Sequence, residues 1–297
     1  MAAEKSRILV VGGTGYLGRH VVAASARLGH PTLALVRDTA PSDAAKAALL
    51  KSFQDAGVTL LKGDLDDHAG LVSAVKLADV VISTVGIMQI PDQTKLAAAI
   101  KEAGNVKTQR FFPSEFGLDA DRSDAVEPTR SLINASKAAI RRAVEAAGVP
   151  TIGQVLSQSP PVDKALVLGD GDTGVVFVDE ADIAAYTVLA ASDPRAENRT
   201  LHIRPPANTL SHNELLAMWE GKTGRAFERV HVAEDAVLKE NPEASFPLNF
   251  ILSIGHATHI QGEQSKLEVD PSSGVDASEL YPDVKYTTVD DYRNRLL

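Results

Sequence analysis

The stretch Ile8–Gly18, Ile-Leu-Val-Val-Gly-Gly-Thr-Gly-Tyr-Leu-Gly, decides the fold of this chain. Four apolar and mostly β-branched residues that run directly into glycines predict a buried parallel strand followed by a tight turn. The residues after Gly18 have helical composition as far as Gly29, where a helix can stop. The stretch therefore predicts a strand, a glycine turn and a helix.

A glycine turn in this position has a chemical use. The helix N-terminus carries unpaired N–H groups and a partial positive charge, and glycine lets a pyrophosphate approach the backbone. The spacing of Gly12, Gly15 and Gly18 is G-x-x-G-x-x-G, the variant typical of extended short-chain dehydrogenases. An ordinary strand-to-helix turn is the alternative. The residues predicted to contact a dinucleotide here are Gly12, Gly13, Thr14, Gly15, Tyr16, Leu17 and Gly18.

Composition limits the class of protein. The 297 residues are 44% hydrophobic, which suits one large or two modest globular domains. A net charge of -9 argues against a nucleic-acid or anionic-membrane partner, because both need a basic face. The chain has no cysteine, no apolar run near the roughly 18 residues of a membrane span, and no room for a signal peptide before Ile8. We therefore expect a cytoplasmic protein with a small-molecule partner.

Arg37 indicates which dinucleotide is bound. It ends the second predicted strand, Pro31–Val36, where an acid would hold the ribose 2′-hydroxyl of NAD and an arginine accommodates the 2′-phosphate of NADP. Lys46, at the start of the next helix, supplies a second cation, so NADP is favoured. Asp38 keeps NAD open, and simple solvation of both cations is the other alternative.

Strands and helices alternate through the first half. Alternation of this kind predicts a doubly wound parallel α/β sheet of the Rossmann type, with ligands at the carboxyl ends of its strands. That edge collects the glycine turn, Arg37, Gly86–Gln89 and Pro113–Gly117. The further strands are predicted at Val58–Leu61, Asp79–Val85 and Val106–Phe112, and the further helices at Ala44–Ala56, His68–Leu77 and Gln93–Ala103.

Lys137 lies in an unusual place. Pro128–Gly148 predicts a helix with an apolar stripe, and Lys137 falls in the middle of that stripe. A lysine facing the sheet is costly unless its charge is compensated or its pKa falls. The alternative is that its stem packs while the ammonium reaches solvent. The stripe is formed by Ile133, Ile140, Val144 and Ala147.

The second half is less regular. We expect an NADP-binding Rossmann domain at residues 1–155 and a smaller α+β substrate lobe at 156–297, with some elements returning to the main sheet. Ser211 with Glu214 and Thr288 with Asp291 form predicted capping boxes.

Two other motifs look accidental. His256 and His259 have the spacing of metal ligands but no third ligand, so no metal is predicted. Tyr281 and Lys285 match a Tyr-x-x-x-Lys pair, but Pro282 between them predicts a loop.

Taken together, the glycine turn, Arg37, Phe111–Gly117 (FFPSEFG) and Lys137 make the chain similar to the plant isoflavone reductase-like family, an NmrA-like group of atypical short-chain dehydrogenases/reductases. Within it, the phenylcoumaran benzylic ether reductases look closest. Further matching stretches are Gly104–Lys107, Val167–Gly171, Ile203–Leu210 and Ala277–Thr288.

The resemblance implies an NADPH-dependent reductase of a phenylpropanoid-derived phenol. Lys137 would be the general acid/base, Arg37 and Lys46 would hold the 2′-phosphate, and Gln89 with Ser114, Glu115 and Phe116 would lie near the nicotinamide ribose. A depressed lysine pKa would let Lys137 take a phenol proton and open a benzylic ether to a quinone methide that receives hydride. Relatives with similar motifs reduce isoflavones, phenylcoumarans, lignans or coniferyl esters, and a homodimer is open to test.

The chain departs from the family pattern after Pro150. Family members have a full sixth strand and an aromatic-rich substrate loop there, whereas this chain passes almost directly to Gln154. The cofactor half should survive this shortening, because its contacts lie on the first two strand-helix units. The alternative function is therefore a protein that binds NADP(H) without reducing a substrate, or a redox-sensing protein.

Overall fold

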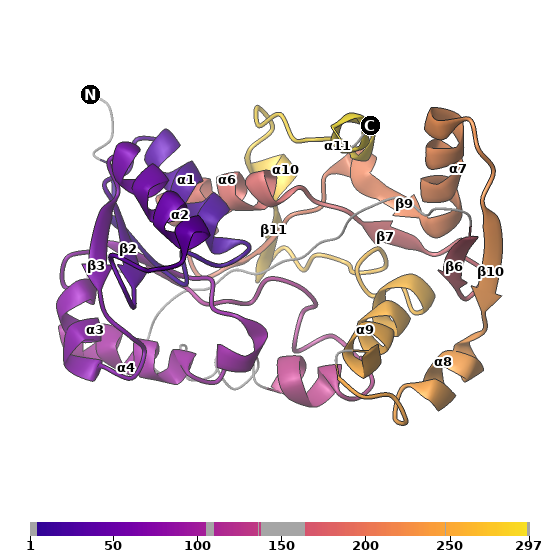
Figure 1. The fold of residues 1–297 in the computed structure, drawn as a ribbon, viewed down its shortest axis with the longest axis horizontal. Helices are drawn as coiled ribbons and strands as arrows, with labels where there is room; N and C mark the ends of the chain where they lie inside the picture. The colour runs from indigo at the N-terminus through magenta and orange to yellow at the C-terminus, as the bar shows by residue number, and fades with distance from the viewer. Residues whose placement is uncertain (1–4, 105–109, 136, 138–163, 247, 296–297) are drawn as a thin grey trace.

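The computed structural model describes residues 5–104, 110–135, 137, 164–246 and 248–295 (Figure 1). The predicted helix Pro128–Gly148, the predicted domain boundary at 155/156 and the shortened segment after Pro150 lie largely or wholly outside these ranges. The π-helix η2, Arg130–Ala135, is the described beginning of that predicted helix.

A five-stranded parallel sheet organises the first half. Its order is β3-β2-β1-β4-β5, so the chain starts in the middle and winds outward in both directions, as predicted. Ile8–Val11 is buried along its whole length because helices cover both faces. The strands are β1 (Ile8–Val11), β2 (Thr32–Val36), β3 (Thr59–Lys62), β4 (Val80–Ser83) and β5 (Arg110–Phe112).

Two apolar clusters fill the space between sheet and helices. Side chains of β1 alternate between them: Ile8 and Val10 join one cluster, and Leu9 and Val11 join the other. The first cluster contains α1 (Gly18–Arg27), α2 (Ala44–Asp55) and α6 (Glu180–Ala191), and the second contains α3 (His68–Val75) and α4 (Gln93–Ala103). Helix α6 comes from the second half of the chain and packs against α1 (Figure 1).

The second half contains three separate two-stranded pairings in the described chain. Parallel pairs join β6 (Lys164–Leu168) to β10 (Glu228–Val232) and β8 (Thr200–His202) to β11 (Gly274–Asp276). An antiparallel pair joins β7 (Gly174–Val176) to β9 (Thr209–Ser211). The helices are α7 (His212–Thr223), α8 (Glu234–Glu240), α9 (Leu248–Gly255), α10 (Ala277–Leu280) and α11 (Val289–Asn294), with the π-helix η5 at His256–Ile260.

Local capping signals were reliable. Both predicted capping boxes are present, at the starts of α7 and α11. In contrast, α8 begins after Ala233, which has no side chain able to cap, and β11 is three residues long, so neither was predicted.

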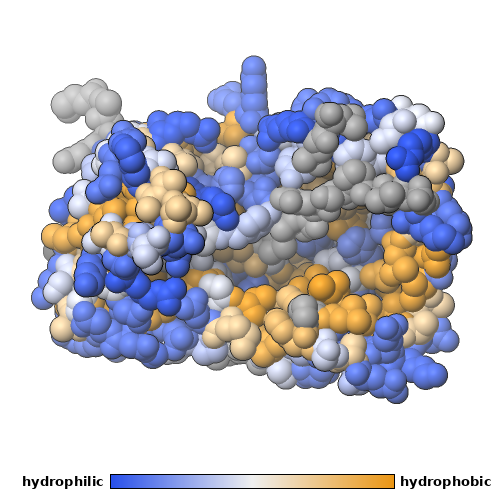
Figure 2. Space-filling view, viewed as in Figure 1, coloured by the Kyte–Doolittle hydropathy of each residue, from blue (hydrophilic) through white to orange (hydrophobic). Residues whose placement is uncertain are grey.

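Figure 2 shows apolar side chains gathered over α9, where Phe246, Leu248 and Ile251 are exposed.

Candidate functional site

The glycine turn between β1 and α1 is closely packed. Gly12 has φ of +83°, and a Cβ built on it would lie 2.7 Å from the carbonyl oxygen of Thr84. A Cβ on Gly18 would lie 2.2 Å from the carbonyl oxygen of Gly12. The Gly15 N–H donates to that same oxygen at 2.9 Å. These contacts bring the start of α1 against the ends of β1 and β4, and they require glycine.

The N-terminus of α1 is open to an anion. Leu17 is the N-cap residue and offers no side-chain hydrogen bond, and the first turn holds no acid that would offset the helix dipole. A phosphate group matches such a helix end.

Two cations follow at the next strand-helix unit. Arg37 comes directly after β2, and Lys46 is in the first turn of α2, where its N–H donates to the capping Asp43 carboxylate at 2.7 Å. Both side chains are exposed, and neither makes a hydrogen bond or ion pair with the described residues. Both charges are therefore available to an anionic ligand.

On the other side of the turn, Ser114 after β5 bonds both the start of α4 and the end of β4. The Ser114 N–H donates to Gln93 Oε1 at 2.6 Å, and the Ser114 hydroxyl donates to the Val85 carbonyl at 2.9 Å. Gln93 is fully buried. The sequence did not indicate this, because a polar residue at the start of a helix is usually exposed to solvent. Ser114 and Glu115 are buried as well, Phe116 is half-buried, and Gln89 is exposed on the short helix η1 (Ile87–Gln89).

Lys137 is buried, with 2% of its surface exposed. Its Nζ donates to the carbonyl oxygens of Glu115 and Phe116, both at 3.2 Å, and of Leu118 at 3.4 Å. The amine therefore does not reach solvent along its stem. These bonds fix the Lys137 amine against the loop that follows β5, at the predicted ligand edge.

A cavity of about 60 Å³ lies beside this loop. The pKa of His202 in its wall is lowered by burial and by Arg204, whereas burial raises the pKa of Glu263. The lining comprises Glu115, Gly117, Leu118, Asp119, Arg122, Ser123, Val176, Thr200, His202, Arg204, Glu263, Gln264 and Leu267.

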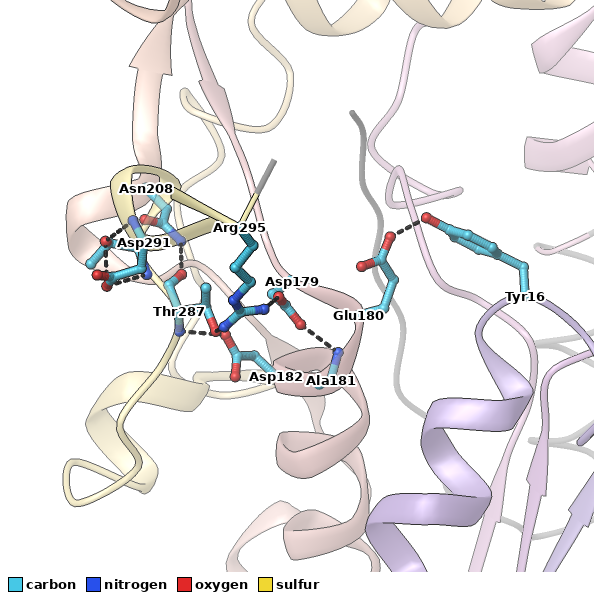
Figure 3. Close-up of polar contacts among 10 residues, drawn as sticks. Tyr16, Asp179, Glu180, Ala181, Asp182, Asn208, Thr287, Asp291 and Arg295 are labelled. Carbon is cyan, nitrogen blue, oxygen red and sulfur yellow. Dashed lines mark hydrogen bonds and ion pairs between the residues drawn. The ribbon is translucent and has the colours of Figure 1, made fainter. Parts of the chain in front are cut away.

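The side chain of Tyr16 points away from the turn toward the second half (Figure 3). Its hydroxyl donates to Glu180 at the start of α6, and burial together with this carboxylate raises the Tyr16 pKa. Neighbouring acids hold the C-terminal segment: Asp179 pairs with Arg295 at 2.9 Å, and Asp182 accepts from the Thr287 N–H at 2.6 Å.

The remaining sequence motifs make other contacts. His256 Nε2 lies 2.8 Å from Glu234, and Thr258 bonds His259 Nδ1 at 2.8 Å. In the described ranges no group of three His, Asp or Glu residues could hold a metal ion, and no helix is long and apolar enough to cross a membrane. Tyr281 follows α10 and is outside any helix, as predicted for the loop.

The chain is similar in sequence and in fold to known proteins. The family model "NmrA-like family" matches residues 4–157 and 151–293. The isoflavone reductase homolog IRL of Zea mays is 70% identical over 312 aligned positions that cover 100% of both chains, so the alignment contains positions that these 297 residues lack. The phenylcoumaran benzylic ether reductase TP7 of Nicotiana tabacum is 52% identical, covering 98% of both chains. A solved structure of AtPrR2 with NADP+ and (+)-pinoresinol superposes with a TM-score of 0.90 at 38% identity, covering 99% of this chain and 100% of that one.

Proposed function

The chain belongs to the NmrA-like family, and we propose that it is an NADPH-dependent reductase that opens a benzylic ether in a phenylpropanoid-derived phenol. The observation that carries this proposal is the buried Lys137 amine, fixed by three carbonyl oxygens beside a cavity at the ligand edge of the sheet. The relatives named as phenylcoumaran benzylic ether reductase and isoflavone reductase support the substrate class.

The residues present fit NADPH. The start of α1, which has no side-chain cap, and the close-packed glycines suit the pyrophosphate. The cations Arg37 and Lys46, which have no side-chain partner among the described residues, suit the 2′-phosphate. Gln89 and the segment from Ser114 to Phe116 are assigned to the nicotinamide side. When bound, NADPH supplies the hydride that the reduction needs.

In this proposal Lys137 moves the proton. A neutral amine accepts the phenol proton of the substrate, and the ammonium that forms donates to the Glu115, Phe116 and Leu118 carbonyls, whose dipoles stabilise its charge. The phenolate pushes electrons toward the benzylic carbon, and the ether C–O bond breaks with its electron pair on the departing oxygen, which takes the proton back from Lys137. The quinone methide that remains would receive the hydride supplied by NADPH at the benzylic carbon, and the resulting phenolate would take a proton from water.

Titration and turnover test the two halves of the proposal. NADPH should bind at least about tenfold more tightly than NADH, because only NADPH carries the 2′-phosphate. NADPH should be consumed with dehydrodiconiferyl alcohol. Binding without consumption of NADPH with any phenylpropanoid would favour the non-catalytic NADP(H)-binding alternative.

Lys137→Ala separates proton transfer from cofactor binding. We expect kcat to fall by roughly 10²- to 10⁴-fold, the contribution of general acid-base catalysis, with an unchanged dissociation constant for NADPH. Lys101→Ala is the control, because Lys101 is an exposed lysine in the last turn of α4. Equal turnover in wild type and Lys137→Ala would exclude Lys137 as the proton-transfer residue.

A further inference from the structure

Gln93 is a polar residue on an otherwise apolar buried face of α4. It opens the helix, and none of its surface is exposed. Leu96, Ala97 and Ile100 share this face and belong to one apolar cluster. The Gln93 oxygen, Oε1, accepts a hydrogen bond, whereas its amide nitrogen, Nε2, is buried without a hydrogen-bond partner among the described residues. Because an unsatisfied buried amide lowers stability, apolar packing alone does not account for a glutamine here.

The contact made by Gln93 fixes the residue at which the loop after β5 turns. The Ser114 N–H donates to Gln93 Oε1 at 2.6 Å, and the Ser114 hydroxyl donates to the Val85 carbonyl at 2.9 Å. Ser114 is also the centre of a three-residue turn, because the Glu115 N–H donates to the Pro113 carbonyl at 2.8 Å. Ser114 is buried, so water does not readily replace Gln93 as the acceptor.

The residues that follow Ser114 directly hold the Lys137 amine. Lys137 Nζ donates to the carbonyl oxygens of Glu115 and Phe116, both at 3.2 Å, and of Leu118 at 3.4 Å. The Glu115 carbonyl comes one residue after Ser114, and the planar peptide bond between them leaves few rotatable bonds. A displacement of Ser114 therefore displaces the acceptors of the amine.

We propose that Gln93 is a positioning residue whose Oε1 anchors the loop at residues 114–118 and so holds the Lys137 amine where it exchanges a proton with the substrate, an inference that rests on the proposed reductase function. A misplacement of about 1 Å can cost about 100-fold in rate, so losing the anchor lowers kcat without removing a reacting group. The NADPH phosphates are assigned to α1, Arg37 and Lys46. The affinity for NADPH should therefore depend little on Gln93.

Gln93→Met and Gln93→Glu separate the acceptor from the packing. Methionine keeps the length of the side chain but offers only a weak sulfur acceptor, whereas glutamate keeps an oxygen for the Ser114 N–H. With NADPH and dehydrodiconiferyl alcohol, kcat should fall about tenfold in Gln93→Met and stay within about threefold of wild type in Gln93→Glu. The dissociation constant for NADPH should change less than about threefold in both, because the phosphate contacts lie elsewhere. Equal kcat values in the two variants, or weaker NADPH binding with unchanged kcat, would overturn the proposal.

A double-mutant cycle shows whether Gln93 acts through Lys137. In the Lys137→Ala background, Gln93→Met should change the residual turnover by less than about twofold, because the amine that the loop positions is gone. A further loss of about tenfold there would mean that Gln93 supports the fold or another residue, and would overturn the proposal.

Leu96→Met is the matched control. It alters the same buried face of α4 without removing a hydrogen bond, so kcat should stay within about twofold of wild type. A loss of kcat in Leu96→Met equal to that in Gln93→Met would assign the effect to packing and overturn the anchor.

Amide hydrogen exchange tests the anchor independently of turnover. Exchange at the N–H groups of residues 114–118 should be about tenfold faster in Gln93→Met than in wild type or Leu96→Met. Unchanged exchange overturns the anchor. If wild type does not consume NADPH, or Lys137→Ala turns over as fast as wild type, the proposed function fails. Exchange alone then decides whether Gln93 holds the loop, and faster exchange in Gln93→Met still supports the anchor.

Discussion

The parallel sheet buries aliphatic side chains on both faces, whereas the second half of the chain buries Arg293, Asp182 and His256 beside its apolar residues. Two continuous clusters enclose the sheet, while the separate cluster around Trp219 in the second half is small. Apolar burial is nondirectional and tolerant, but a buried charge depends on its specific partners. Substitutions should therefore affect the two regions for different reasons.

The largest effect is expected where the sheet meets its glycine turn. Gly12→Ala introduces a Cβ 2.7 Å from the Thr84 carbonyl oxygen at a φ of +83°, so strain and overlap add. We expect a loss of about 3 kcal/mol in the free energy of unfolding, together with more than about tenfold weaker NADPH binding. Urea denaturation and cofactor titration measure the two effects.

Gly29→Ala is the control for Gly12→Ala. Gly29 has a similar φ of +80°, but no atom lies within 4 Å of a Cβ built there. Only the backbone strain of about 1 kcal/mol remains. Equal losses for both variants would show that the close approach to β4 is unimportant.

In the second half, the largest effect is expected at Arg293. Its side chain is 2% exposed and lies 4.6 Å from the centre of the Trp219 ring, and it donates to the Leu215 carbonyl. Burial lowers its pKa to about 10. Arg293→Ala should cost about 3 kcal/mol through lost packing, the lost cation–π contact and the lost hydrogen bond.

Arg295→Ala, two residues along the chain, tests the same segment at its surface. The Arg295 side chain is 58% exposed, and its ion pair with Asp179 is worth less than about 1 kcal/mol. Thermal or urea denaturation of both variants gives the comparison. A larger loss for Arg295→Ala would mean that surface charge, and not the buried cation, holds the C-terminal segment.

This contrast explains what could be read from the sequence. The run Ile8–Val11, the helix Gln93–Ala103 and both capping boxes depend on neighbouring residues, and the structure has them where they were predicted. Short elements such as β11 depend on a partner strand more than 70 residues away, which no local pattern reveals.

Some residues of the candidate site could likewise be predicted from local sequence, and others could not. The glycine turn and Arg37 carry recognisable spacing, and Lys137 was detectable as a cation in an apolar stripe. Gln93 carried no signal, because its contact is with the backbone of Ser114, which lies 21 residues further along the chain in the loop after β5.

A buried histidine in the second half should make the fold sensitive to acid. Burial lowers the pKa of His259 to about 4 from its ordinary 6.5, with His212 contributing. Between pH 6.5 and about 4, the His259 ring is protonated in the unfolded chain but stays neutral in the folded chain. The free energy of unfolding therefore falls as the pH drops from 6.5 toward 4. The loss attributable to His259 is at most about 3 kcal/mol.

Urea denaturation at pH 7 and pH 4.5 measures this loss. His259→Gln removes the titrating ring and should reduce the difference in unfolding free energy between the two pH values. An unchanged difference would show that His259 does not carry the acid sensitivity.

The smallest effect is expected at the contact that joins the two regions. Tyr16→Phe removes the hydrogen bond to Glu180 while keeping a ring that is half exposed, so the loss in unfolding free energy should be about 1 kcal/mol. Glu180→Gln keeps an acceptor for the Tyr16 hydroxyl and should cost less. Because α1 and α6 also share an apolar cluster, the two regions should still unfold together in Tyr16→Phe. Separate transitions for the two regions would show that this one hydrogen bond, and not the shared apolar cluster, couples them.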